Sequence, residues 1–354
     1  MSAATSPETN SDLSAGTGHT DDTLLSVRDL HVHFPMGGGW LRKKTALKAV
    51  DGVSFDIRRG RTFGIVGESG SGKSTTALAV MRLVRITSGH VQLGDAPIGN
   101  LEGDALRVQR RRFQMVFQDP YASLNPRKRA GDAILDALNL MNVGEPASRP
   151  ARARELFLQT GLQPEQLMLF PHQFSGGQRQ RIVLARALAA KPELVVCDEP
   201  VSALDVAIQA QMLNLMLRLQ RQFGLTYLFI SHDLGVVRHM CDEVAVMYLG
   251  RIVERAGRDT LFAQPLHPYT RALWSAAPSF NPRQRSRGRR IHLQGEPPSP
   301  MVANAGCRFS GRCPHVQDVC RNAEPILREV AGRHWVACHR VGDDGLVTYQ
   351  QPSG

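Results

Sequence analysis

Long apolar runs are missing from this sequence. The longest, at residues 227–230 and 244–249, have the length of a buried strand, whereas a membrane-spanning helix needs about 20 apolar residues. A basic stretch followed by an apolar one, as in secretory signals, is also missing, because residues 1–22 are polar and lean acidic. We therefore expect a cytosolic chain in which residues 1–22 form a flexible tail.

Signatures of nucleic-acid recognition are missing too. The net charge is +11 and basic runs occur at 58–61, 110–112 and 283–290, but no zinc finger, RNA-recognition or helix-turn-helix pattern accompanies them. Solvated faces and a basic linker explain these runs more simply than a nucleic-acid surface. We expect no nucleic-acid partner, and this charge also suits a protein that works against the inner face of a membrane.

Closely paired cysteines, which typify zinc knuckles, do not occur. Two of the six cysteines, Cys197 and Cys241, fall in patterns typical of small core residues. The other four cluster late in the chain, at Cys307, Cys313, Cys320 and Cys338. In a reducing cytosol such a cluster favours a metal site over disulfides. Three states of these cysteines remain open: they could bind an iron–sulfur cluster, bind a zinc ion with His315 or His339 as substitute ligands, or be free thiols.

The hydrophobic pattern indicates strands that alternate with helices. Strands are expected at 24–34, 49–57, 62–66, 193–197, 226–231 and 243–249, and helices at 73–84, 207–223 and 235–241. Residues from about 119 to 175 have a mainly helical pattern. The expected fold is an α/β class with a three-layer core, a mainly parallel sheet and a helical subdomain at about 119–182.

A glycine-rich segment between an apolar strand and a helix fits G-x-x-x-x-G-K-[ST], the phosphate loop of nucleotide-binding proteins. Its backbone N–H groups and the following helix dipole would bind phosphates. Lys73 would contact the β- and γ-phosphates and Ser74 would bind Mg²⁺. The candidate nucleotide residues here are Gly67, Ser69, Gly70, Ser71, Gly72, Lys73, Ser74 and Thr75.

Two acids end a later apolar strand, at Asp198 and Glu199. A buried strand would deliver Asp198 to Mg²⁺, while Glu199 points elsewhere and can act as the general base for an attacking water.

A third motif lies between these two. Residues 174–181 read FSGGQRQR, which resembles the signature motif of ATP-binding cassette (ABC) ATPases. Ser175 can cap a helix whose N-terminus would bind a phosphate beside Gly176, Gly177 and Gln178. The resemblance implies that this helix closes over the ATP of a partner ATPase in a head-to-tail dimer, and it implies a RecA-like core.

Further residues match the family in the expected order. Gln118 resembles the glutamine that contacts the metal region, Asp205 lies in the loop that crosses the dimer interface, and His232 resembles the histidine that contacts the γ-phosphate. Phe34 resembles the aromatic residue that stacks on adenine, although Trp40 competes for this role and a plain core phenylalanine is an alternative.

The resemblance extends to one subgroup. VFQDPYASLNP at 116–126, HPYTRAL at 267–273 and GEPP at 295–298 are similar to the ATPases of oligopeptide and dipeptide importers, and to the second (F-type) of their two ATPases. This implies an ATPase that drives peptide uptake from the cytoplasmic face of the inner membrane. The implied partners are a second ATPase in a heterodimer, two permeases and an external binding protein.

The same resemblance implies a [4Fe–4S] cluster at Cys307, Cys313, Cys320 and Cys338, which we expect to be structural rather than redox-active. It also divides the chain into a tail at 1–22, an ABC ATPase domain at 23–255 and a cysteine-bearing C-terminal region at 256–354. The competing hypothesis is a non-transport ABC ATPase that acts as an assembly or nucleic-acid-related factor.

Overall fold

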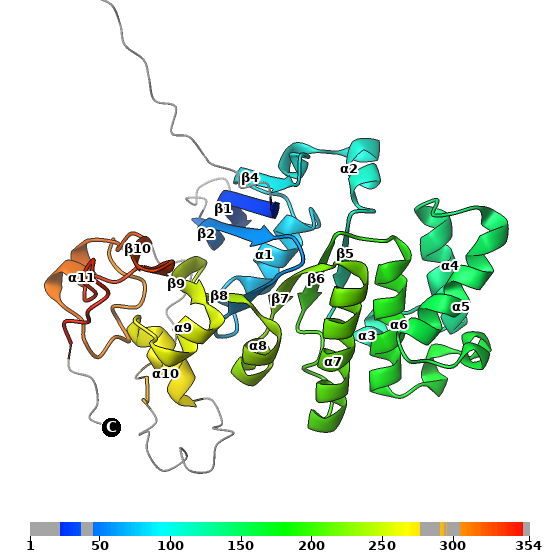
Figure 1. Cartoon of the computed structure of the whole chain (residues 1–354). Helices are drawn as coiled ribbons and strands as arrows, with labels where there is room; N and C mark the ends of the chain where they lie inside the picture. Colours follow the sequence, from blue (N-terminus) through cyan, green and yellow to red (C-terminus); the bar gives the residue numbers. More distant parts are fainter. Residues whose placement is uncertain (1–21, 37–44, 277–290, 294, 296–304, 350–354) are drawn as a thin grey trace, which may run out of the picture.

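The computed structural model describes residues 22–36, 45–276, 291–293, 295 and 305–349. The predicted tail, Trp40, the basic run at 283–290 and most of the GEPP motif lie outside these ranges. Three parts lie side by side in Figure 1: the C-terminal region beside β9, the central sheets, and the helices α3 to α6.

The central sheet has eight strands, in the order β10-β11-β9-β8-β3-β7-β6-β5. Five neighbouring strands are parallel, and the remaining three add antiparallel at one edge. The parallel strands are β5 (Phe113–Val116), β6 (Leu194–Asp198), β7 (Thr226–Ile230), β3 (Thr62–Val66) and β8 (Glu243–Tyr248). The antiparallel strands are β9 (Arg251–Gly257), β11 (His334–Val336) and β10 (Arg328–Ala331). The predicted parallel core is therefore present.

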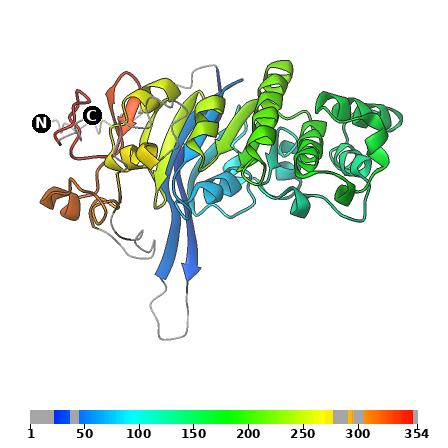
Figure 2. The same ribbon diagram turned by 90° about the horizontal axis from the view of Figure 1, so that it is seen from below.

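A second, antiparallel sheet has the order β2-β1-β4 and covers one face of the central sheet. Its strands are β1 (Thr23–Met36), β2 (Thr45–Arg58) and β4 (Ser88–Leu93). The paired β1 and β2 extend well beyond the rest of the fold in Figure 2. The sequence pattern predicts β1 and β2 as strands but does not predict β4 or this separate sheet.

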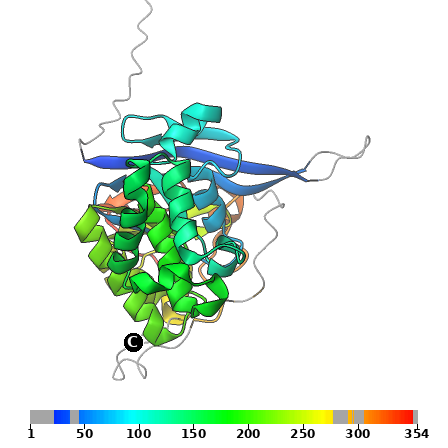
Figure 3. The ribbon, with the colours of Figure 1, turned by 90° about the vertical axis from the view of Figure 1, so that its right-hand side faces the viewer.

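The helices lie mainly on the other face. Figure 3 looks from the β5 edge of the central sheet, where α4 to α7 stand in front and the antiparallel sheet lies above them. The helices are α1 (Lys73–Val80), α2 (Gly103–Gln109), α3 (Pro120–Ser123), α4 (Ala130–Leu140), α5 (Arg149–Gln159), α6 (Gly176–Ala189), α7 (Val206–Phe223), α8 (Leu234–Met240), α9 (Arg258–Ala263), α10 (Pro268–Ala276) and α11 (Asp318–Asn322), with short 3₁₀ turns at Ile98–Asn100, Pro146–Ser148, Pro164–Met168 and Pro171–Gln173. Helix α1 ends before residue 84, where the pattern places its end, because Arg82 adopts a left-handed φ of 54°.

Alternating side chains of the buried strands build two cores. On β6, Val195 and Cys197 pack with the helical side, whereas Leu194 and Val196 pack with the antiparallel sheet. This alternation follows from the two-residue repeat of a strand that is buried on both faces. The prediction that Cys197 is a core residue is confirmed, and Cys241 is equally buried, at 1% exposure.

Candidate nucleotide site

The phosphate loop connects β3 to α1, as its spacing predicts. Gly67 and Gly72 have φ angles of 155° and 102°. A Cβ atom on either would lie 2.2 Å from a backbone oxygen, that of Met247 or of Ala49. Only glycine fits at these two positions, so the chain can turn tightly against β2 and β8.

Lys73 begins α1 and lies beneath this loop. Its ammonium donates hydrogen bonds to the carbonyl oxygens of Gly67, at 2.9 Å, and Glu68, at 2.8 Å. Burial lowers the pKa of Lys73, although the carboxylates of Glu199 and Asp198 oppose this shift. The lysine is thus buried among loop carbonyls and near the two acids of β6, where a phosphate group would add the missing negative charge.

Ser74 and Asp198 face each other across the loop. The Ser74 hydroxyl donates to Asp198 Oδ1 at 3.0 Å, which places together the two residues predicted to bind Mg²⁺. Burial is the main reason that the pKa of Asp198 lies above its ordinary value, while the hydrogen bond from Ser74 lowers it. A carboxylate with a hydroxyl beside it is the oxygen-rich donor set that Mg²⁺ prefers.

Glu199 follows Asp198 and lies between two other predicted site residues. Its Oε1 is 3.0 Å from Nδ1 of His232, and its Oε2 accepts a hydrogen bond from Gln118 Nε2 at 3.3 Å. Its backbone φ is 49°, in the left-handed region that non-glycine residues rarely adopt. The backbone of Glu199 therefore has an uncommon conformation. Its carboxylate lies where three polar side chains from separate loops meet, those of Glu199, His232 and Gln118.

These groups line one cleft of about 750 Å³. Phe34, at the end of β1, lines the same cleft and is 36% exposed, so the core alternative for this residue is wrong. Predicted residues on the cleft wall are Phe34, Ser69, Gly70, Gly72, Lys73, Ser74, Thr75, Gln118, Glu199 and His232. Leu47, Lys48, Ala49, Leu249 and Gly250 line it as well, and no local sequence motif marks these five.

The signature segment lies elsewhere. Ser175 caps α6: its hydroxyl accepts a hydrogen bond from the Gln178 backbone at 3.3 Å, and the Gln178 side chain accepts one from the Ser175 backbone at 3.0 Å. Gly177 packs against α7, since a Cβ there would lie 2.5 Å from Ile208. Ser175 and Asp205 are exposed, and no signature residue lines the cleft around Lys73. The helix end thus presents free N–H groups away from this chain's own phosphate loop.

The four late cysteines all lie in the described segment 305–349. Cys320 and Cys338 are buried, and Cys307 and Cys313 are partly exposed. Burial raises the pKa of Cys307 to about 11 and that of Cys338 to about 12, and the neighbouring thiols contribute to both shifts. Backbone N–H groups point at the sulfurs of Cys307, Cys313 and Cys338. The fold therefore gathers the four thiols, and N–H donors stand ready to stabilise thiolates.

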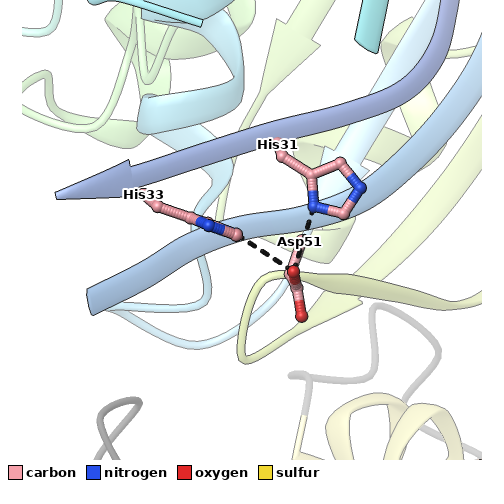
Figure 4. Close-up of side chains that lie close together, drawn as sticks. All are labelled: His31, His33 and Asp51. Carbon is pink, nitrogen blue, oxygen red and sulfur yellow. Dashed lines mark hydrogen bonds and ion pairs between the residues drawn. The ribbon is translucent and has the colours of Figure 1, made fainter. Parts of the chain in front are cut away.

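A compact group that the sequence motifs do not mark lies where the later part of β1 pairs with β2 (Figure 4). Nδ1 of His31 and Nε2 of His33 are each 3.0 Å from Oδ1 of the buried Asp51. In the described part of the chain, this is the one group of three or more His, Cys, Asp or Glu whose ligand atoms all lie within 4.8 Å. Arg308 and Arg251 occupy the other oxygen of Asp51, so the carboxylate is already neutralised and we interpret the group as an ion-pair network.

Comparison with known proteins identifies the family. The chain is 49% identical to the oligopeptide transport ATP-binding protein AppF of Bacillus subtilis over 325 residues, which are 91% of this chain and 99% of that protein. It is 46% identical to the di/tripeptide transport ATP-binding protein DppF of Pseudomonas aeruginosa, over 90% of this chain and 98% of that protein. The chain belongs to the ABC ATPase family. Within it, the chain groups with AppF and DppF, ATP-binding proteins of oligopeptide and di/tripeptide transporters that carry the letter F in their names.

Two family models match separate parts of the chain. The ABC transporter model matches residues 50–202, and the oligopeptide/dipeptide transporter C-terminal model matches residues 253–320. Among solved structures, the ATP-binding cassette MJ0796 as a dimer with ADP and phosphate is 27% identical, with a TM-score of 0.59 over 66% of this chain and 99% of that chain. The cbiO1 protein of Clostridium perfringens, at 25% identity, has the same TM-score over 68% of this chain and 91% of its own. The chain is therefore an ATPase with a phosphate-loop α/β core, as predicted.

Among the described residues, none of the helices is long and apolar enough to cross a bilayer.

Proposed function

We propose that this chain is the ATP-binding subunit of an importer for oligopeptides or dipeptides. The observation that carries the proposal is its 49% identity, over nearly the full length of both chains, to a protein named for oligopeptide transport. The match of residues 253–320 to the C-terminal region of such transporters supports the same cargo class. The chain would bind at the cytoplasmic face of the inner membrane through two permeases, with a peptide-binding protein outside.

The site residues receive roles within this proposal. Lys73 would contact the β- and γ-phosphates of ATP, Ser74 and Asp198 would hold Mg²⁺ with help from Gln118, and Glu199 would be the general base. His232 would contact the γ-phosphate, and Phe34 would stack on adenine.

The position of the signature segment, outside this chain's own cleft, supports a dimer. Because the capped end of α6 lies outside this chain's own cleft, Ser175, Gly176, Gly177 and Gln178 would complete the ATP site of a second ATPase, with Asp205 at the interface. We propose a heterodimer, in which two ATP molecules clamp the subunits together and hydrolysis releases them. We also propose the division into an ATPase domain at 23–255, with its helical subdomain at about 119–182, and a C-terminal region at 256–354.

Purification of the tagged chain from gently solubilised membranes of the producing cell tests this function. We expect mass spectrometry to identify two permeases and a second ABC ATPase, and a Glu199→Gln variant to retain them. Recovery of the chain with soluble enzymes or nucleic acid, and without permeases, would instead favour a non-transport ATPase.

We further propose that Cys307, Cys313, Cys320 and Cys338 bind a [4Fe–4S] cluster. Four thiols near enough to interact electrostatically, with backbone N–H groups on three sulfurs, suit a thiolate-bound centre. A zinc ion fits less well, because it would hold its sulfurs within about 4 Å of one another, whereas no three of these thiols lie within 4.8 Å of one another. The cluster would crosslink residues 305–340 and supply structural order.

Cys313→Ser is the matching test. We expect anaerobically purified wild-type chain to contain about four iron and four sulfide per chain, and the variant to lose them, fold less efficiently and assemble poorly. Turnover per assembled complex should change little. One zinc per chain and no iron would contradict the iron–sulfur assignment, and an ATPase rate that follows the oxidation state of the cluster would contradict the structural role.

A further inference from the structure

The segment between Cys307 and Cys313 lies against the phosphate loop. Arg312 donates two hydrogen bonds to the carboxylate of Glu68, from Nη1 to Oε2 at 2.8 Å and from Nη2 to Oε1 at 3.2 Å. The Arg312 side chain is only 9% exposed. A two-point bond between a guanidinium and a carboxylate fixes direction as well as distance, so Arg312 restrains the orientation of Glu68.

A second residue of the C-terminal region holds the same glutamate. The hydroxyl of Tyr269, on α10, accepts a hydrogen bond from the Glu68 backbone N–H at 2.9 Å. The Tyr269 ring is fully buried against Tyr248 and Phe309, with ring centres 4.7 and 5.5 Å away. Tyr269 belongs to the HPYTRAL segment, to which the nucleotide motifs assign no role.

Glu68 also contacts Lys73, the lysine of the phosphate loop. Its carbonyl oxygen accepts a hydrogen bond from Lys73 Nζ at 2.8 Å. Three residues therefore bind Glu68: Tyr269 accepts a hydrogen bond from its N–H, Arg312 donates to its carboxylate, and Lys73 donates to its carbonyl oxygen. A change in the first two contacts would move the carbonyl that orients the lysine ammonium.

Arg308 binds the segment that packs beside the phosphate loop at Ser71. It donates to the Leu249 carbonyl and to Oδ2 of Asp51, the carboxylate that His31 and His33 contact in Figure 4. Next to Leu249, the Gly250 N–H donates to the Ser71 carbonyl at 2.8 Å. Arg312 therefore contacts the phosphate loop directly at Glu68, whereas Arg308 reaches it indirectly, through Leu249 and its neighbour Gly250.

We propose that Arg312 and Tyr269 are positioning residues for nucleotide binding, which act through Glu68 to hold the phosphate loop and Lys73 in place. Neither residue lines the nucleotide cleft, so their effect would pass through the loop backbone. The C-terminal region would then be part of the ATP site and not only an appendage to it. This inference concerns the ATPase itself and does not depend on which cargo the transporter carries.

Equilibrium binding of Mg·ADP to the full-length chain tests the proposal, with variants Arg312→Lys, Glu68→Gln and Tyr269→Phe. Each substitution keeps most of the side-chain volume and removes one contact. We expect each to raise the Kd for ADP by about three- to tenfold. Arg312→Lys and Glu68→Gln weaken the charge-assisted contact, and Tyr269→Phe leaves the backbone N–H of Glu68 without its acceptor. In the assembled complex, KM for ATP should rise while kcat stays within about twofold of wild type.

A pair of controls separates positioning from general loosening. Asp343→Asn breaks another arginine contact of the same region, the 2.9 Å bond from Arg328, and should leave the Kd unchanged. The double variant Arg312→Lys/Glu68→Gln should bind ADP no more weakly than the weaker single variant, since both remove one shared contact. Unchanged Kd values in folded Glu68→Gln and Tyr269→Phe, or fully additive losses, would overturn the proposal.

Discussion

Nδ1 of His232 lies 3.0 Å from Oε1 of Glu199. These residues follow two neighbouring parallel strands, β7 and β6, whose carboxyl ends meet at the same edge of the sheet. Gln118, which follows β5, binds the other carboxylate oxygen. Three adjacent strands thus deliver three polar side chains to one point, and their mutual contacts hold them ready for a phosphate and a water molecule.

Glu199→Gln tests the role of this carboxylate. We expect the variant to bind ATP and to remain in the closed dimer, because the amide keeps the shape of the side chain. Hydrolysis should fall about 10²- to 10⁴-fold, the usual contribution of a general base. Single-turnover hydrolysis and size-exclusion chromatography with ATP measure the two effects.

Glu193→Gln is the control, since Glu193 pairs with Arg112 and Arg59 at the other end of β6. It should keep the wild-type rate. Substantial activity in Glu199→Gln would mean that another group is the base.

Lys73→Ala should fail at an earlier step. The buried ammonium bonds two loop carbonyls, and its loss removes both the charge for the phosphates and the support of the loop. We expect ATP affinity to fall by more than about tenfold, as measured with a fluorescent nucleotide. Lys128→Ala, which removes an exposed cation that contacts Asp136, should bind like wild type. Near-normal affinity in Lys73→Ala would contradict the assigned role.

Local motifs made most of this site predictable from sequence. The residues from Gly67 to Thr75 lie within nine positions, and Asp198 and Glu199 are adjacent, so spacing alone fixes much of their geometry. Gln118 and His232 are predicted from the resemblance to ABC ATPases, and the structure gives the physical reason, because each follows a strand that pairs in parallel with β6. The structure places Glu199, Gln118, His232 and most residues of the phosphate loop on one cleft, with Asp198 hydrogen-bonded to Ser74 beside it.

The antiparallel additions were less predictable, for physical reasons. Strand β9 contains Glu254, which is fully buried and would argue against a core strand. Its carboxylate accepts hydrogen bonds from the backbone of Leu266 and His267 and contacts His334 at 2.7 Å. These partners are 12 to 80 residues away, so no local pattern reveals that the charge is satisfied. The Arg312–Glu68 contact spans 244 residues and is hidden in the same way.

Phe34→Ala tests adenine stacking. Phe34 is half-exposed on the cleft wall, and stacking of a base on an aromatic ring contributes about 1–3 kcal/mol. We expect the Kd for ADP to rise about tenfold, while inorganic tripolyphosphate, which lacks a base, should bind with unchanged affinity. Phe34→Trp should retain ADP binding and report it by fluorescence quenching. Equal weakening of ADP and tripolyphosphate in Phe34→Ala would place the effect on the loop instead of on the base.

Asp51 makes stability depend on pH in a direction that the structure fixes. Burial would raise the pKa of its carboxyl, but the hydrogen bond and charge of Arg308, with His33 and Arg251, hold that pKa well below its ordinary value. The ionised carboxylate therefore stabilises the folded state. This contribution is fully present above the pKa of the unfolded chain, about 3.9, and is lost as the pH falls toward the folded pKa.

Asp51→Asn should accordingly lower the free energy of unfolding at pH 7 by on the order of 2 kcal/mol, the cost of leaving Arg308 without its carboxylate. Urea unfolding of both chains between pH 7 and about pH 3.5 measures the difference, which should shrink toward the acidic end. Asp343→Asn, at a 91% exposed partner of Arg328, should cost little at any pH because surface pairs contribute little. If the difference in unfolding free energy between wild type and Asp51→Asn stays constant or grows as the pH falls, the ionised carboxylate is not the stabilising form. Some other contact would then have to hold Arg308 against the strands beside the phosphate loop.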